Sequence, residues 1–193
     1  MEPGRVEAFS DGVLAVIITI MVLEIKVPHD ADTFEALKPL VPVFLSFVLS
    51  FIMVLIYWNN HHHLFKSVDR VNGNVLLANG HLLFWLSLVP FVTGWMGENH
   101  FTSAPVFAFS VVLFMAGIAY YILEKVLLKL HGPDSVLSKA IGNEKKGIFS
   151  ALLLFISMFT AFPYPMVSCL IFVIIPVMWV IPDSRIEKTL GDE

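Results

Sequence analysis

An arginine, a serine and an aspartate stand at the start of the first apolar stretch of this sequence. The motif Arg-x-x-x-Phe-Ser-Asp-Gly occupies positions 5–12 and runs directly into the apolar segment Val13–Leu23. An ionisable residue inside a membrane is costly, so it usually marks a functional site with a partner elsewhere in the chain. The alternative is an ordinary helix start, in which Ser10 or Asp11 caps the helix and Arg5 lies among lipid headgroups.

Wound as a helix at about 100° per residue, this segment separates into two faces. One face is small or branched, mostly apolar, and carries a single hydroxyl group; its members are Arg5, Phe9, Gly12, Val16, Thr19, Ile20 and Leu23. Ser10 and Asp11 point away from this face, toward whatever packs behind the helix. A stripe that lines a pore and a stripe that faces lipid both have this composition, so the pattern leaves both interpretations open.

Composition and apolar stretches predict a polytopic membrane protein with an all-α fold. Of the 193 residues, 57% are hydrophobic and 15% are charged, and a soluble domain of this size could not bury so much apolar surface. Six stretches approach the roughly 20 residues that a membrane span needs; they are 6–27, 41–62, 74–95, 104–130, 147–162 and 165–181. We therefore expect one domain of six transmembrane helices over residues 1–193. Five spans, with the last two stretches forming a re-entrant hairpin, are the alternative.

The basic residues predict the orientation of the chain, because Lys and Arg gather in cytoplasmic loops. All but two of the twelve Lys and Arg residues fall in the terminal segments, in the second connection, or in the fourth connection and the end of the span that leads into it. The exceptions, Lys26 at the end of the first span and Lys38 in the first connection, lie on the opposite side, so both termini are expected in the cytoplasm. The carboxylates of that first connection have two interpretations: they belong to an ordinary solvated loop, or they raise the local cation concentration at the outer mouth of a pore. The fourth span has almost no polar atoms and is expected to be peripheral or to face lipid.

Three adjacent histidines, His61, His62 and His63, end the second span. Neighbouring helical positions point about 100° apart, so the three side chains cannot converge on one metal ion. No nucleophile motif, paired carboxylates or glycine-rich phosphate loop accompanies them. We expect neither a metal site nor an enzyme, and a histidine-bound metalloenzyme is the last of the alternatives.

Polar side chains near the predicted cytoplasmic ends of the first three spans are expected to form one network. Its members are Ser10, Asp11, Trp58, His61, His62 and Asn79. Trp58 shares a helical face with both histidines, one of which can reach Ser10 or Asp11. The amide of Asn79 must find a partner in hydrocarbon. Such a network anchors the first helix or, because histidine titrates near neutral pH, senses protons. Farther along the third span, Pro90 is expected to kink the helix.

These motifs resemble the prokaryotic members of the transmembrane protein 175 family, to which the lysosomal potassium channel of animals belongs. The resemblance rests on Arg5-x-x-x-Phe9-Ser10-Asp11-Gly12, Trp58-x-x-His61-His62-x-Leu64-Phe65, and Asn79 with Leu88-Val-Pro90-Phe91. It covers the first three spans in detail, whereas the last three agree only in number and length.

The resemblance implies a potassium-selective, leak-type channel, a homotetramer in the cytoplasmic membrane of a prokaryote. Its partners would be other copies of the chain, lipid and monovalent cations, with no cofactor and no nucleic acid. The pore would be lined by Val16, Thr19, Ile20 and Leu23, with the permeant ion at the Thr19 ring. The pore helix would be held by Arg5, Phe9, Ser10, Asp11, Trp58, His61, His62 and Asn79. Relatives often carry Ile or Leu at the narrowest ring, so Val16 implies a wider neck or a constriction displaced to Ile20 or Leu23. The alternative function is a proton-conducting channel or a proton-coupled transporter that uses Asp11 with His61 or His62.

Overall fold

The computed structural model describes residues 2–29, 32–141 and 145–180, and every regular element in these ranges is helical. The elements are α1 Pro3–Leu23, η1 Phe34–Leu40, α2 Val41–Lys66, α3 Gly73–Ser87, α4 Val89–Glu98, α5 Ser103–His131, α6 Val136–Ile141, α7 Lys145–Thr160 and α8 Pro165–Val180. The expected all-α fold is thus confirmed, and the bounds differ from the expected spans by a few residues. Position 181, the expected end of the last span, lies outside the described residues.

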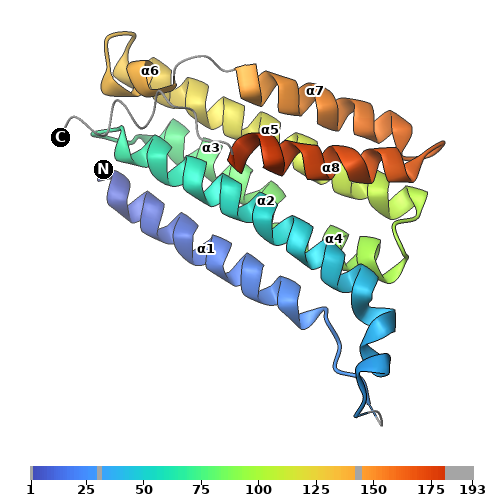
Figure 1. Cartoon of the computed structure of the whole chain (residues 1–193). Coiled ribbons are helices and arrows are strands. Elements are labelled where there is room, and N and C mark those ends of the chain that lie inside the picture. Colours follow the sequence, from blue (N-terminus) through green and yellow to red (C-terminus); the bar gives the residue numbers. More distant parts are fainter. Residues whose placement is uncertain (1, 30–31, 142–144, 181–193) are drawn as a thin grey trace.

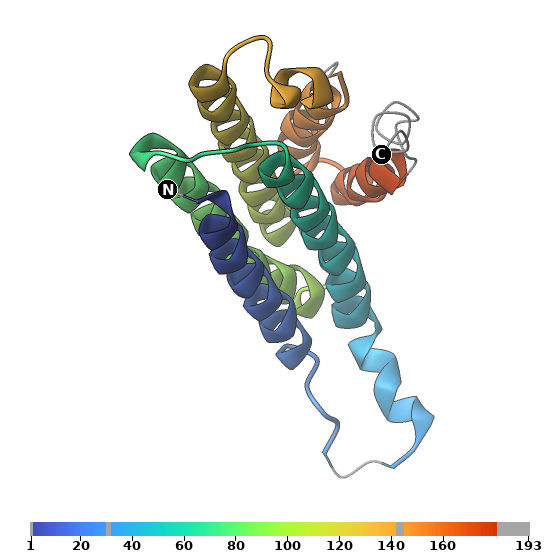
Figure 2. The same cartoon turned by 90° about the vertical axis from the view of Figure 1, so that its left-hand side faces the viewer.

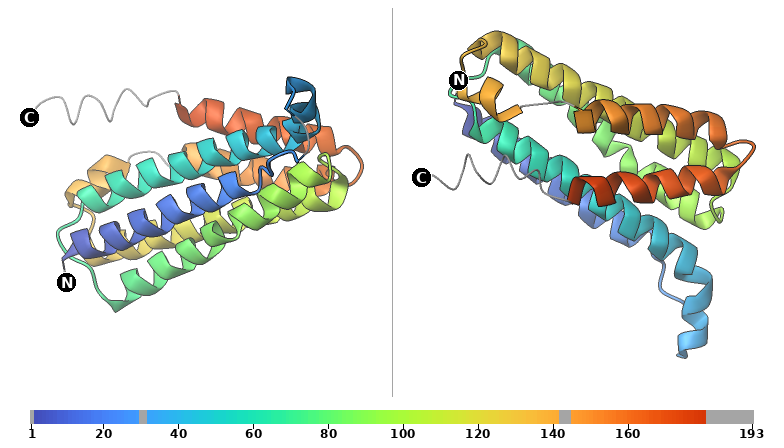
Figure 3. Two further views of the ribbon diagram at one scale, coloured as in Figure 1. Left: turned by 90° about the horizontal axis from the view of Figure 1, so that it is seen from below. Right: turned by 45° about the horizontal axis from the view of Figure 1, so that its top comes forward.

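The long helices run along one common direction as a bundle (Figure 1). Helix α1 lies beside α2 on one side of the bundle, and α7 lies on the opposite side. The N-terminus and α6 lie at one end, whereas the α1–α2 connection and the α7–α8 hairpin lie at the other end. Figure 3 shows the same arrangement from two further directions. Within the described ranges, four helical segments are long and apolar enough to cross a membrane: α1, η1 with α2, α3 with α4, and α5.

Helix α5 is at the centre of the bundle, where it packs against α3, α4, α7 and α8. Phe109, Leu113 and Leu123 are almost fully buried, and the small Ala116 and Ala119 let neighbouring helices approach closely. The expectation that the fourth span is peripheral or faces lipid is therefore wrong. An apolar helix surface suits lipid and other helices equally well, so the absence of polar atoms does not distinguish the two environments.

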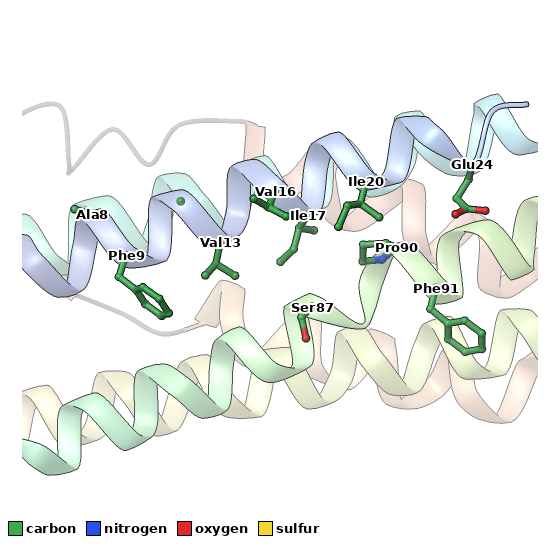
Figure 4. Close-up of a pocket in the computed structure, with 11 residues that line it drawn as sticks. Ala8, Phe9, Val13, Val16, Ile17, Ile20, Glu24, Ser87, Pro90 and Phe91 are labelled. Atoms are coloured by element: carbon green, nitrogen blue, oxygen red, sulfur yellow. The ribbon is translucent and has the colours of Figure 1, made fainter. Parts of the chain in front are cut away.

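The third span is divided at Leu88, two residues before Pro90, into α3 and α4. Proline lacks a backbone N–H and its ring collides with the preceding turn, but it is tolerated in the first turn of a new helix. Pro90 occupies that first turn in α4. The predicted kink is confirmed, and it turns α4 away from the line of α3 beside Ile17 and Ile20 of α1 (Figure 4).

Helices α7 and α8 form the predicted hairpin, joined by the turn at residues 161–164. Two hydroxyl side chains and one backbone carbonyl tie its closed end together. Ser168 Oγ lies 2.8 Å from Thr160 Oγ1 and donates to the Ser157 carbonyl at 2.8 Å. Toward the open end, Trp179 Nε1 donates to Ser150 Oγ at 2.9 Å. Each helix has 16 residues, which corresponds to about 24 Å, shorter than a hydrocarbon core of about 30 Å.

Candidate functional site

Helix α1 has one buried face and one uncovered face. The buried side chains are Val6, Ser10, Leu14, Ile17 and Met21, which pack toward α2, α3 and α4. The uncovered face is the stripe expected from the sequence, Arg5, Phe9, Gly12, Val16, Thr19, Ile20 and Leu23, all of them exposed in the single chain. The exposed fractions are 54% for Val16, 43% for Ile20 and 67% for Leu23. A run of large apolar side chains is therefore available to contact something outside this chain.

A chain of hydrogen bonds attaches the buried face of α1 to α3 and α2. Asn79 Nδ2 donates to Ser10 Oγ at 2.9 Å, and Ser10 Oγ donates to the Val6 carbonyl at 2.8 Å. Asn79 Oδ1 lies 2.8 Å from His61 Nε2, and an amide oxygen only accepts, so His61 Nε2 is the donor. Ser10, His61 and Asn79 are each at most 3% exposed. The ring of Phe65 stacks on the His61 imidazole at 4.4 Å.

A second set of contacts attaches α1 to α2 beside the first. Trp58 Nε1 donates to Asp11 Oδ1 at 2.9 Å, and His62 Nδ1 lies 2.6 Å from Glu7 Oε1. The Trp58 and His62 rings stack with their centroids 6.2 Å apart. Glu7 precedes Asp11 by four residues and His62 follows Trp58 by four, so each pair occupies one helix face and the antiparallel helices meet twice. The network expected from the sequence did not include Glu7. Its spacing of four residues from Asp11 puts both carboxylates on one helix face, and this spacing could have identified it.

The contacts differ from the expected pairing in two respects. His61 reaches Ser10 only through Asn79, and Asp11 is bound by Trp58 rather than by a histidine. Arg5 and Phe9, which the resemblance placed among the anchoring residues, are both exposed on the uncovered face of α1. His81 accepts a hydrogen bond from Trp85 Nε1 at 3.0 Å within α3.

An open groove of about 790 Å³ lies between α1 and the junction of α3 with α4. Its walls are mostly apolar, and Figure 4 shows Val13, Ile17 and Ile20 of α1 on one side, with Ser87 and Pro90 on the other. Phe9, Val16 and Ile20 belong both to this groove and to the uncovered stripe. The groove therefore extends the apolar surface of α1 sideways onto α3 and α4.

Carboxylates lie at the end of α1 farthest from His61, His62 and His63. Glu24 and Glu98 line a pocket of about 240 Å³ together with Trp95. The Glu24 carboxylate is 3.9 Å from Lys26 Nζ and partly exposed, so this ion pair adds little stability. A methyl group on Gly94 would lie 3.2 Å from Glu24 Cγ, so the glycine lets this side chain pack on α4.

The histidines at the end of α2 do not converge. His61 is directed at Asn79 and His62 at Glu7, and the rings of His62 and His63 meet edge to face. Over the ranges that the structure describes, no group of three or more His, Cys, Asp or Glu side chains is placed to hold a metal ion.

Comparison with known proteins gives the family. The family model described as "Endosomal/lysosomal potassium channel TMEM175" matches residues 5–90. A protein of Chryseobacterium sp. (strain P1-3) named as a potassium channel is 50% identical over 192 residues, which cover 100% of both chains. The human endosomal/lysosomal proton channel TMEM175 is 38% identical over 86 residues, 39% of this chain and 17% of that protein.

A solved structure agrees with the whole fold. The crystal structure of a lysosomal potassium-selective channel TMEM175 homolog from Chamaesiphon minutus superposes with a TM-score of 0.79 at 28% sequence identity. The match covers 92% of this chain and 96% of that chain. The multi-pass membrane protein described above therefore belongs to the TMEM175 family of ion channels.

Proposed function

We propose that this protein is a potassium-selective, leak-type cation channel whose pore is lined by the α1 helices of four identical subunits. The observation that carries the proposal is the division of α1 into two faces. A buried hydrogen bond holds one face against α3 and an exposed one ties it to α2, while large apolar side chains project from the other face without cover in the single chain. Four such faces around one axis would bury each other and enclose a pathway. The potassium channel names of the bacterial relatives support this assignment.

The proposed topology is a single six-span domain over residues 1–193, in the cell membrane of a prokaryote with both termini cytoplasmic. Helices α7 and α8 would supply the two spans beyond the four long segments. Placing all basic residues except Lys26 and Lys38 on one side requires an even number of spans, which favours six over five.

Selection in such a pore would depend on the loss of water from the ion. Rings formed by Val16, Ile20 or Leu23 make a short apolar neck in which a hydrated cation must distort or shed its shell. Water holds potassium less tightly than sodium, so the penalty is smaller for potassium. An apolar neck also closes by dewetting after a small rotation of its helices. This mechanism gives modest selectivity and needs no carbonyl filter.

Thr19 is the proposed contact for the permeant ion. Its hydroxyl donates to the Val16 carbonyl at 2.9 Å, and the side chain is exposed on the uncovered face. Because the proton is engaged with the helix, the oxygen lone pairs are free to accept a cation or its water. Four hydroxyls at one level would replace part of the hydration shell between the apolar rings.

The test is the reversal potential of the purified protein in lipid bilayers under a potassium–sodium gradient. The reversal potential of the wild-type protein should be displaced from zero toward the potassium equilibrium potential, and Leu23→Ala should shift this value back toward zero. Leu77→Ala is the matched control, because Leu77 is 76% exposed but lies on α3. A tetramer that carries no current, or equal shifts in the two variants, would refute a channel that selects ions along α1.

The second candidate is a proton-conducting channel or a proton-coupled transporter that uses Asp11 with His61 or His62. It is favoured by the cluster of Asp11, Glu7 and His62 along the N-terminal half of α1, and by the proton channel name of the human relative. Proton flux that Asp11→Asn abolishes while potassium current persists would support this candidate. Flux that saturates with a co-transported solute would indicate the transporter.

A further inference from the structure

The short helix η1, between α1 and α2, has an apolar side and a charged side. A 3₁₀ helix has three residues per turn, so residues three apart lie directly above one another. Phe34, Leu37 and Leu40 therefore form one stripe, while Glu35 and Lys38 form a neighbouring stripe. The Glu35 and Lys38 side chains are joined by an ion pair of 2.6 Å and are both about three-quarters exposed.

None of the seven residues of η1 is buried against the rest of the chain. Phe34 is 91% exposed and Leu37 is 47% exposed. Figure 2 shows why: η1 projects past the end of the bundle, as the right panel of Figure 3 also shows. An exposed, ordered apolar stripe beside a charged one indicates contact with another apolar phase.

Helix lengths locate η1 relative to the bilayer. Helix α2 has 26 residues, which at about 1.5 Å per residue spans about 39 Å, more than the roughly 30 Å of a hydrocarbon core. The helix that follows η1 is thus long enough to cross the core by itself. This places η1 at the boundary between the hydrocarbon core and the lipid headgroups, at the end of the bundle opposite His61, His62 and His63.

The apolar side chains of η1 are followed by others at the start of α2. Val41, Phe44 and Leu45, in the first turns of α2, are each at least 50% exposed. Exposed apolar side chains are therefore found both on the first turns of α2 and on η1. The ion pair on the other side of η1 leaves no net charge, which suits a helix that lies flat under headgroups.

We propose that η1 is an interfacial helix, with Phe34 and Leu37 inserted among the lipid acyl chains and Glu35 and Lys38 facing water. Lying flat in the interface, it anchors the connection that follows the last turn of α1. The partner is the lipid surface itself, and the inference does not depend on which ion the protein conducts.

Site-directed spin labelling tests this placement. The chain has one cysteine, Cys169, so a Cys169→Ala background accepts single labels. Phe34→Cys and Leu37→Cys report on the apolar stripe, while Glu35→Cys and Lys38→Cys are the matched controls one position farther along. Each protein is reconstituted in phosphatidylcholine vesicles, and the label's collisions with oxygen and with a water-soluble nickel chelate are measured. Labels on the apolar stripe should collide severalfold more with oxygen and severalfold less with nickel than their controls.

Two other outcomes would overturn the proposal. Equal access of nickel to both stripes would show that η1 stands in water. Protection of the apolar stripe from both reagents, with dipolar broadening between labels, would show that it packs on a second copy of the chain. Because Phe34 is almost fully exposed, its replacement should not impair folding, and elution of each variant with the parent protein verifies this. The readout needs no current, so a failed channel assignment would leave the result interpretable.

Discussion

Gly97 allows α4 to approach α2 so closely that no other residue fits there. A Cβ atom added at this position would lie 2.7 Å from Val43 Cα and 3.3 Å from Val43 N, and would also collide with Ser46 Oγ. Side-chain atoms can turn away, but the backbone of α2 can move only as a unit. We therefore predict that Gly97→Ala forces α2 and α4 apart and destabilises the protein.

The size of the effect follows from two opposing contributions. Overpacking of this kind typically costs about 1–3 kcal/mol. Replacing a helical glycine with alanine also returns about 1 kcal/mol through helix propensity. Gly80→Ala in α3 is the matched control, because an added Cβ there meets nothing within 4 Å. Propensity favours Gly80→Ala fully and Gly97→Ala less, because Gly97 is the second-to-last residue of α4, so the two variants should differ by at least the overpacking cost of about 1–3 kcal/mol.

Thermal unfolding in detergent measures this difference. For a chain of this length each kcal/mol shifts the Tm by about 2–4 °C. Gly97→Ala should melt below the wild-type protein, and Gly80→Ala should melt at or above it. If Gly97→Ala melted as high as Gly80→Ala, the close approach of α2 and α4 would not exist, and the packing described here would be wrong.

Two further predictions concern α1 and its contacts. Asn79→Ala leaves the buried His61 N–H without its acceptor and should lower the free energy of unfolding by about 1–3 kcal/mol. Thermal unfolding measures this loss, and Asn74→Ala, on the exposed first turn of α3, is the control. Thr19→Val keeps the shape of the side chain but removes its oxygen, so the potassium-to-sodium permeability ratio should fall, while Thr19→Ser should retain it. Unchanged ratios in both Thr19 variants would remove the hydroxyl from the selection mechanism.

The apolar stretches could be located from the sequence because membrane spans are long and uniform. Their packing could not, and α5 is the clearest example. Phe109 and Leu113 are buried in the bundle, yet Phe84 and Leu77 of α3 are exposed, and the four residues are alike in polarity. In hydrocarbon the choice between helix and lipid depends on shape, which single-residue polarity does not report.

The polar contacts of α1 were also predictable only in part. Periodicity separated Ser10 and Asp11 from the apolar stripe, because helical spacing alone fixes the face on which a residue lies. The choice of partner depends on helix register and side-chain reach, which a single sequence does not contain. Trp58 and His62 shared a predicted face, but only the antiparallel register assigns Trp58 to Asp11 and His62 to Glu7.

The direction of the hydrogen bonds also separates the two candidate functions. From His61 the donors run through Asn79 to Ser10, and Ser10 donates to the Val6 carbonyl. A backbone carbonyl passes no proton on, and the amide of Asn79 is a poor proton carrier, so we propose that this buried chain only anchors α1. Any proton pathway must instead follow the partly exposed contacts of Asp11 and His62. If the protein conducts protons, the flux should therefore survive loss of the His61 contact but not loss of Asp11. If it is a potassium pore, the His61 contact and Asp11 are needed only to hold α1 in place.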